Sequence, residues 1–409
     1  MAALLNAESQ KKLATGSDIL AVAIAVSLPW STSATSILVA LWFFTLVPVL
    51  RWDEVRRESL TLAGGLPVLL VLLGAAGMLW ADVTLIERWK GLDSFLKLLA
   101  IPLLLVQFRR SGHGNWVFAG YLLSCIVLLA ATTIVIAVPP LAAKFLHFDN
   151  VIVKNAATQS GEFVICIFGL LYLLVGDIEQ RRWPWALVCA AVVLVMLGNI
   201  FYFSTGRTAL VTIFVLFVLL VFKIQNIKTI VGLLAAAIVL GIIAWMSSPY
   251  LRERTEAVQV EAQKYAKTNE RTSTGERLEF WKKSAEFIRG APIIGHGTGS
   301  IRTLFEKAAS GQIGAAGVAA ANPHNQTLAA GIQLGVLGMV VLWAMWLAHL
   351  ILCRGNSVAA WIGLVVVAQN ITGSLFNSHI FDFAQGWTYV VGVGIAGGTI
   401  LRQRAAASI

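Results

Sequence analysis

Residues 228–247 read Lys-Thr-Ile-Val-Gly-Leu-Leu-Ala-Ala-Ala-Ile-Val-Leu-Gly-Ile-Ile-Ala-Trp-Met-Ser, an apolar run whose one charged residue is its first. A helix of about 20 apolar residues crosses the hydrocarbon core of a bilayer. The one long polar stretch of the chain, from about 247 to 325, follows this run directly. The stretch therefore predicts a transmembrane helix that leads into a large loop at the membrane surface.

Apolar runs of this kind recur along all 409 residues. The chain is 58% hydrophobic and only 13% charged, whereas a soluble domain carries roughly a quarter charged residues. We expect an all-α polytopic bundle of about twelve transmembrane helices. The predicted spans are 18–33, 34–50, 64–80, 94–108, 115–138, 161–176, 184–200, 207–222, 228–247, 326–352, 357–374 and 384–401.

This pattern divides the chain into three parts. Residues 1–246 hold about nine spans, residues 247–325 form the loop, and residues 326–409 hold about three spans. The first two spans meet at Pro29 and are compatible with one broken helix. The first apolar run lacks the cleavage pattern of a signal peptide, so we expect it to remain as an anchor.

The Lys and Arg residues predict the orientation. If the N-terminus is cytoplasmic, the junctions on that side hold fourteen of them and the short junctions on the other side hold five. The fourteen are Lys11, Lys12, Arg51, Arg56, Arg57, Arg109, Arg110, Arg181, Arg182, Lys223, Lys228, Arg354, Arg402 and Arg404, and the five are Arg88, Lys90, Lys144, Lys154 and Arg207. Cationic short loops remain in the cytoplasm. We therefore expect both termini to be cytoplasmic and the 247–325 loop to lie on the outer side of the membrane.

Within the loop, a helix is expected from Ser273 to about Arg289. Ser273 and Glu276 have the spacing of a capping box, and Gly290 with Pro292 ends the segment. An apolar face is predicted at helical spacing. Its members are Leu278, Trp281, Ala285 and Ile288.

Alternate glycines follow in Pro292-Ile-Ile-Gly-His-Gly-Thr-Gly299. Glycine permits positive φ and close backbone approach. Two interpretations remain open: a cradle of N–H groups for phosphate, or a tight turn that docks the loop onto the bundle. The segment matches neither a Walker A loop nor a dinucleotide-binding fingerprint.

Arg207 and His324 are the unusual residues near predicted span ends. Arg207 follows Gly206 at the start of an apolar run, where a helix N-terminus already favours anions. Its charge either binds an anion or extends to lipid phosphates. His324 follows Pro323 where the loop re-enters the membrane. A histidine there is either a structural residue or a rigid, solvent-reachable base.

Together these segments resemble the O-antigen ligase and polymerase superfamily of bacterial membrane proteins. The resemblance is carried by Ser-Thr-Gly-Arg207-Thr-Ala-Leu, Arg277-xxx-Trp281, Pro292-xx-Gly295-x-Gly297, His324-Asn325 and Gly335-Val-Leu-Gly338. It covers about residues 195–350 by motif and the whole chain by topology. Leu337 stands where the family often has threonine.

The resemblance implies a metal-independent glycosyltransferase, without a cofactor, in the inner membrane of a Gram-negative bacterium. It implies transfer of O-antigen from undecaprenyl pyrophosphate to the lipid A–core of lipopolysaccharide at the periplasmic face. His324 would be the general base of an inverting reaction, and Arg207 and Arg277 would bind the pyrophosphate. The secondary candidates are Asn325, Arg254, Arg271, Arg289, Arg88 and Asp382, the last together with His379. Glu276 is expected to be a helix cap rather than a base.

Other functions stay open at this point. An O-antigen polymerase and a protein O-oligosaccharyltransferase belong to the same superfamily, and the single large loop favours the ligase. A transporter is compatible with twelve spans, but Lys97 is the only charged residue we identify inside one. The basic residues are dispersed, so we expect no nucleic-acid partner. The four cysteines lie in apolar runs and are expected to be buried thiols, not disulfides or metal ligands.

Overall fold

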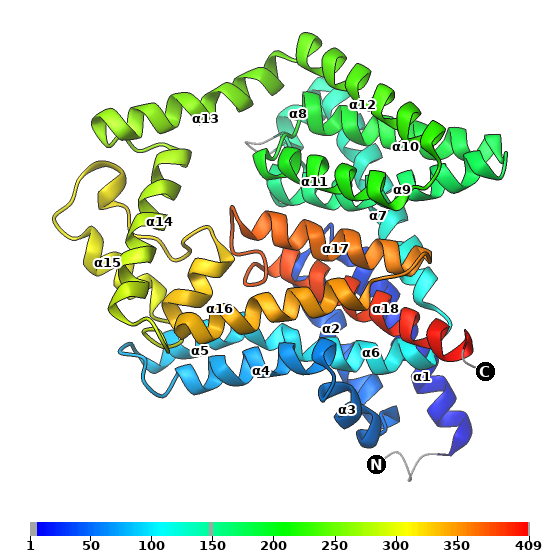
Figure 1. The fold of residues 1–409 in the computed structure, drawn as a ribbon, viewed down its shortest axis with the longest axis horizontal. Coiled ribbons are helices and arrows are strands. Elements are labelled where there is room, and N and C mark those ends of the chain that lie inside the picture. The colour runs from blue at the N-terminus through cyan, green and yellow to red at the C-terminus, as the bar shows by residue number, and fades with distance from the viewer. Residues whose placement is uncertain (1–5, 147–149, 408–409) are drawn as a thin grey trace.

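The computed structural model describes residues 6–146 and 150–407, and within them every regular element is a helix. The chain folds as a bundle of long helices that carries three further helices at one end (Figure 1). The expected all-α class is therefore confirmed.

Each of the twelve predicted spans falls on a helix or a helix pair. These helices are α1 (Ala7–Ser27), α2 (Thr32–Leu46), α4 (Leu62–Gly77), α5 (Leu85–Leu96) with α6 (Ala100–Arg110), α7 (Gly114–Ala137), α9 (Ala156–Glu179), α10 (Trp183–Tyr202), α11 (Arg207–Lys223), α12 (Ile227–Ser247), α16 (Gln326–Leu352), α17 (Val358–Ser374) and α18 (Phe383–Ala407). The remaining α-helices are α3 (Trp52–Ser59), α8 (Pro139–Phe145), α13 (Pro249–Thr268), α14 (Ser273–Gly290) and α15 (Ile301–Ala309). Short 3₁₀ turns occupy Val47–Val49, Lys97–Leu99 and Gly314–Gly317.

Among the described residues, seven helical segments are long and apolar enough to cross a membrane, or eight if the bent pair α3 and α4 forms one span. The seven are Thr32–Val49, Leu85–Arg110, Gly114–Ala137, Ala156–Glu179, Trp183–Tyr202, Ile227–Ser247 and Gln326–Leu352. The number twelve therefore stays a prediction. The first two apolar runs are separate helices, α1 and α2, because Ser31 begins a new helix by accepting a hydrogen bond from the N–H of Ala34.

Large aromatic side chains fill the centre of the bundle. Trp42, Trp346, Trp361 and Phe108 are almost completely buried. The indole N–H groups of these tryptophans find acceptors inside the bundle: Trp42 donates to Gln107, and Trp361 to the carbonyl of Phe168. A buried tryptophan needs such a partner, so these hydrogen bonds fix how the helices pack.

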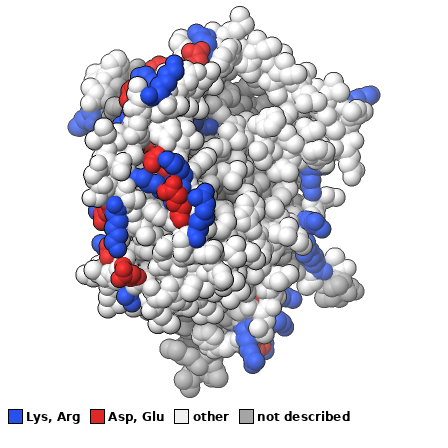
Figure 2. All heavy atoms as spheres, turned by 60° about the vertical axis from the view of Figure 1, so that its left-hand side comes forward, with Lys and Arg blue, Asp and Glu red and all other residues white. Residues whose placement is uncertain are grey.

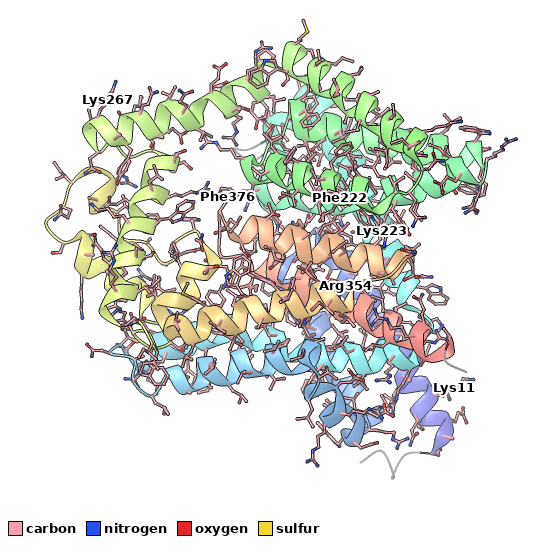
Figure 3. All side chains as sticks on the ribbon, in the orientation of Figure 1. Lys11, Phe222, Lys223, Lys267, Arg354 and Phe376 are labelled. Carbon is pink, nitrogen blue, oxygen red and sulfur yellow. The ribbon has the colours of Figure 1, made fainter. Side chains whose placement is uncertain are left out.

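The bundle has two distinct ends. α13, α14 and α15 lie at one end, and both termini lie away from them (Figure 1). Lys11, Lys223 and Arg354 lie toward the far end, whereas Lys267 lies at the tip of α13 (Figure 3). Figure 2 shows charged side chains gathered in groups toward both ends, with a wide uncharged area between them. Such an area suits contact with lipid tails.

A broken helix docks the glycine-rich turn onto the bundle. Gly335 interrupts α16 with φ +63°, which leaves the carbonyls of Ile332 and Gln333 without their usual helical partners. The N–H groups of His296 and Gly297 bond to these carbonyls at 2.8 and 2.9 Å. In return, the N–H of Val336 bonds to the carbonyl of Pro292 at 2.8 Å. The turn thus repairs the gap in the helix ladder.

The same turn also contacts α4. The N–H of Thr298 donates to the carbonyl of Gly77, and the N–H of Gly299 donates to the side chain of Gln333. The N–H groups that could have cradled a phosphate are therefore used within the protein. The docking interpretation is correct for this turn, and the phosphate cradle is not.

Candidate active site

Arg207 is the first residue of α11 and is held there by tight packing against α9. Ser204 and Thr205 before it are fully buried. The N–H of Gly206 donates to Ser160 Oγ at 3.2 Å, and a Cβ at Gly206 would lie 2.6 Å from that same oxygen. Only glycine fits this approach, so the sequence before Arg207 fixes where its side chain starts.

The Arg207 guanidinium binds a carboxylate on α13. Its two terminal nitrogens donate to the two oxygens of Glu261 at 2.7 and 3.0 Å, and both side chains are about one-fifth exposed. Thr274, in the first turn of α14, donates to the same carboxylate through its N–H and its hydroxyl. These bonds lower the pKa of Glu261 to about 2. Extension of Arg207 to lipid phosphates is therefore not what the structure shows.

Arg277 lies one turn after Thr274 on α14 and has no such partner. Among the described residues, none forms a hydrogen bond or an ion pair with its guanidinium. Burial and the neighbouring charge of Arg207 lower its pKa, while Glu261 partly offsets this. The side chain nonetheless remains charged at any physiological pH. Arg277 is thus a half-buried cation with free donors beside a second cation.

His324 has a constrained backbone and a defined ring position. Its φ is +53°, in the left-handed region, and its N–H donates to Asn322 Oδ1 at 2.8 Å. The ring stacks on Phe280 of α14 with centroids 6.1 Å apart. Its Nδ1 lies 3.1 Å from Asn377 Oδ1. Contacts from α14 and from the loop after α17 therefore hold the imidazole in one orientation.

The hydrogen bonds assign the neutral tautomer of His324. Asn377 Oδ1 also accepts from Asn322 Nδ2 at 2.9 Å, so this oxygen acts as an acceptor and His324 Nδ1 carries the hydrogen. The Nε2 lone pair is then free. Burial and the charge of Arg277 lower the pKa of His324, despite opposing effects of Asn377 and Glu276. The ring is therefore neutral, and able to accept a proton, at neutral pH.

The three residues expected at the centre of the site lie together at the α14 end of the molecule. The charge of Arg277 acts on both Arg207 and His324. They come from three separate elements: the start of α11, the middle of α14 and the segment before α16. The structure thus brings together a free guanidinium, a paired guanidinium and a neutral imidazole.

Three secondary candidates are occupied within the fold. Asn325 caps α16 through its side-chain oxygen and donates to the carbonyl of Leu375. Arg88 donates to the carbonyls of Met78 and Val83, which closes the turn between α4 and α5. Asp382 accepts from the N–H of Gln385 at the start of α18.

The other candidates differ in exposure. Arg254 stacks on Tyr250, and its buried Nε has no hydrogen-bond partner in the part of the chain that the structure describes. Arg271 is largely exposed and pairs with Glu276, and Arg289 is exposed. His379 is buried, and burial lowers its pKa to about 4.

Two details of the α14 prediction were wrong. The helix is capped by Thr272, not by Ser273, and Glu276 binds Arg271 without closing a capping box. Leu278 of the expected apolar face is exposed, because the buried face centres on Phe280 and Ser284. Phe280 packs against Phe305 of α15, and this contact sets the rotation of α14.

Sequence reasoning missed four residues that shape the site. They are Glu261, Thr274, Asn322 and Asn377. No periodic pattern marks them, since each lies in a polar segment beside similar residues. Their partners lie more than 50 positions away along the chain, except for the Asn322–His324 and Thr274–Glu261 bonds.

The sequence analysis also missed buried charge inside the predicted spans. Lys97 is not the only charged residue there: Asp18 of α1 and Glu162 of α9 are both more than nine-tenths buried. Asp18 accepts from Gln107, and Glu162 pairs with Lys154. Both are therefore partnered, as charges within a bilayer need to be.

The apolar helices and the charged site define an integral membrane protein with its polar machinery at one end of the molecule. Residues 191–343 match the model of the O-antigen ligase family. The match supports membership of the chain in that family, and the matched segment contains Arg207, Glu261, Arg277 and His324. The resemblance noted from the motifs is thereby confirmed.

A curated relative adds little about function. A protein of Haemophilus influenzae described as "Uncharacterized protein" is 29% identical over 119 residues, which is 28% of this chain and 30% of that protein. The match thus spans less than a third of the relative's length.

Proposed function

We propose that this chain is an O-antigen ligase, which transfers a glycan from undecaprenyl pyrophosphate to the lipid A–core of lipopolysaccharide at the periplasmic face of the inner membrane. The observation that carries this proposal is Arg277. Its guanidinium is half-buried, has no partner among the residues that the structure describes, and lies near both Arg207 and an imidazole, so it suits a ligand that brings its own negative charge. A pyrophosphate is such a ligand.

The two arginines would divide the work on the donor. Guanidinium binds phosphate oxygens through parallel N–H bonds. Within residues 6–146 and 150–407, no group accepts a hydrogen bond from Arg277 or from the buried Nε of Arg207. Together they would hold the diphosphate and stabilise the charge that grows on it as it leaves.

His324 would act as the base. The acceptor hydroxyl oxygen forms a bond to the anomeric carbon while the bond from that carbon to the phosphate oxygen breaks. The hydroxyl proton passes to His324 Nε2, and undecaprenyl pyrophosphate leaves with the electron pair. Attack from the face opposite the leaving group inverts the anomeric configuration. The lowered pKa of His324 supports this role, because it keeps Nε2 unprotonated at neutral pH.

The test is transfer by the purified full-length protein. The donor is O-antigen on undecaprenyl pyrophosphate, the acceptor is rough lipopolysaccharide, and gel electrophoresis reports the ladder. We expect ladders from the unmodified protein, also in EDTA, and none from His324→Ala at normal membrane insertion. Ladders from His324→Ala would remove the imidazole from the mechanism, and activity restored only by magnesium or manganese would show a metal requirement.

Deletion of the gene separates the ligase from the polymerase. Loss of a ligase leaves rough lipopolysaccharide while long O-antigen accumulates on the lipid carrier. Loss of a polymerase leaves core capped by a single repeat unit, which would refute the ligase proposal.

A further inference from the structure

A polar cleft adjoins the site. Its volume is about 520 Å³, within the range of pockets that bind small molecules. Its walls come from α5, from α15 with Gly299 before it, from α16, from residues 321–323 and from the segment between α17 and α18. None of the arginines assigned to the donor lines it.

The charges of this cleft differ from those around Arg207. Lys90 and Arg302 contribute two positive groups, and Glu87, Glu306 and Asp382 contribute three negative groups. Three carboxylates disfavour a diphosphate at this position. Mixed carboxylate and cationic groups instead suit sugar hydroxyls, which both donate and accept hydrogen bonds.

One wall of the cleft is bonded to the proposed base. Asn322 and Ser378 line the cleft, and Ser378 Oγ donates to Asn322 Oδ1 at 2.7 Å. The same Asn322 oxygen accepts from the N–H of His324, and its amide nitrogen bonds to Asn377, the partner of the ring. A ligand in the cleft therefore lies against the segment that positions the imidazole.

The wall formed by the 378–382 segment is held rigid by side chains of α16 and of the turn after α5. Lys97 Nζ donates to the carbonyls of Ile380, Phe381 and Asp382 at 3.1, 3.2 and 2.9 Å. Gln326 Oε1 accepts from the N–H groups of Ile380 and Phe381. The cleft is thus preformed, which reduces the cost of ordering a wall when a ligand binds.

We infer that this cleft binds the acceptor, as a hydroxyl-rich oligosaccharide whose end reaches His324 Nε2. The inference rests on the proposed transferase function and adds that the two substrates bind at two sites of different charge. The arginine side takes the anionic donor head, and the mixed-charge cleft takes the acceptor sugars.

The test compares kinetic constants of the full-length protein. Lys90→Ala combined with Arg302→Ala removes both cations of the cleft. We expect the KM for rough lipopolysaccharide to rise at least tenfold, because each hydrogen bond to a charged group contributes substantially to binding. The KM for the lipid-linked donor should stay within twofold.

Lys267→Ala combined with Lys282→Ala is the matched control, since both lysines are exposed in the same loop and lie outside the cleft. This control should leave both constants unchanged. The oligosaccharide released from rough lipopolysaccharide by mild acid serves as a lipid-free probe, and it should compete with the acceptor and not with the donor.

The outcomes separate the two proposals. An unmodified protein without transferase activity refutes the proposed function itself. If the unmodified protein is active, and the double cleft variant has the same melting temperature and an unchanged acceptor KM, the cleft does not bind the acceptor. A rise in the donor KM alone would assign the cleft to the donor glycan and would equally overturn the inference.

Discussion

Replacement of Arg277 by alanine tests the proposed donor site most directly. The side chain has no internal partner among the described residues and lies beside the like charge of Arg207. Its removal therefore breaks no internal hydrogen bond and relieves a repulsion. We expect the melting temperature of Arg277→Ala to equal or exceed that of the unmodified protein.

The loss of activity should nonetheless be large. Two hydrogen bonds to a charged phosphate, at roughly 1.5–3 kcal/mol each, amount to about 3–6 kcal/mol. At 1.36 kcal/mol for each factor of ten, kcat/KM for the donor falls by about 10² to 10⁴. Arg277→Lys retains the charge without the planar pair of donors, so it should lose less.

Arg207→Ala provides the contrast. This change leaves the largely buried Glu261 carboxylate without its ion pair, which costs stability as well as activity. Both variants should be assayed by donor-dependent ladder formation in detergent or nanodiscs and by thermal unfolding.

Two results would refute this reasoning. One is Arg277→Ala with near-normal donor kinetics. The other is an Arg277→Ala protein that loses as much melting temperature as Arg207→Ala, which would mean that Arg277 stabilises the fold and is not held free for a ligand.

Further predictions concern the supporting residues. Asn377→Asp should raise the pKa of His324, because a carboxylate favours the protonated ring, and the acid limb of the kcat/KM profile should move to higher pH; an unmoved limb would contradict the assigned contact. The Glu261 ion pair stabilises the fold above the ordinary pKa of 4.5, and this contribution is lost as pH falls toward the folded value of about 2. Melting curves of Glu261→Gln should therefore depend less on pH over this window than those of the unmodified protein. Gly335→Ala combines a positive φ with a Cβ 2.3 Å from backbone, so it should lower the free energy of unfolding by about 3 kcal/mol or more. In the control Gly232→Ala, the new Cβ meets nothing within 4 Å, so this change should be neutral. Equal melting temperatures of the two variants would refute the strain argument.

The helices of the bundle were predictable because apolar runs of membrane length have few alternatives. The structure has a helix at each predicted range, including the 228–247 run, which is α12. Boundaries were less predictable, since caps such as Thr272 depend on which neighbouring side chain reaches the N–H group. The rotation of α14 depends on Phe305, which lies 25 residues after Phe280 in another helix.

The site was predictable only in part. Arg207 and His324 are conspicuous because charge at the end of an apolar run and a histidine after a proline are unusual. The partners that tune them are ordinary polar residues. Glu261 is one of several acidic residues in the loop, and only the arrangement of α11 against α13 selects it. Asn377 can be recognised as the partner of His324 only when α17 has been placed beside α16.

The break at Gly335 has a consequence for exchanging parts between relatives. The 292–299 turn and the middle of α16 each supply what the other lacks, so neither half is a self-contained module. Consider a chimera that receives this turn in a host whose tenth apolar segment is an unbroken helix. The N–H groups of the turn would then face carbonyls that already accept hydrogen bonds within that helix. Grafts of substrate specificity between such proteins should therefore carry both stretches or neither.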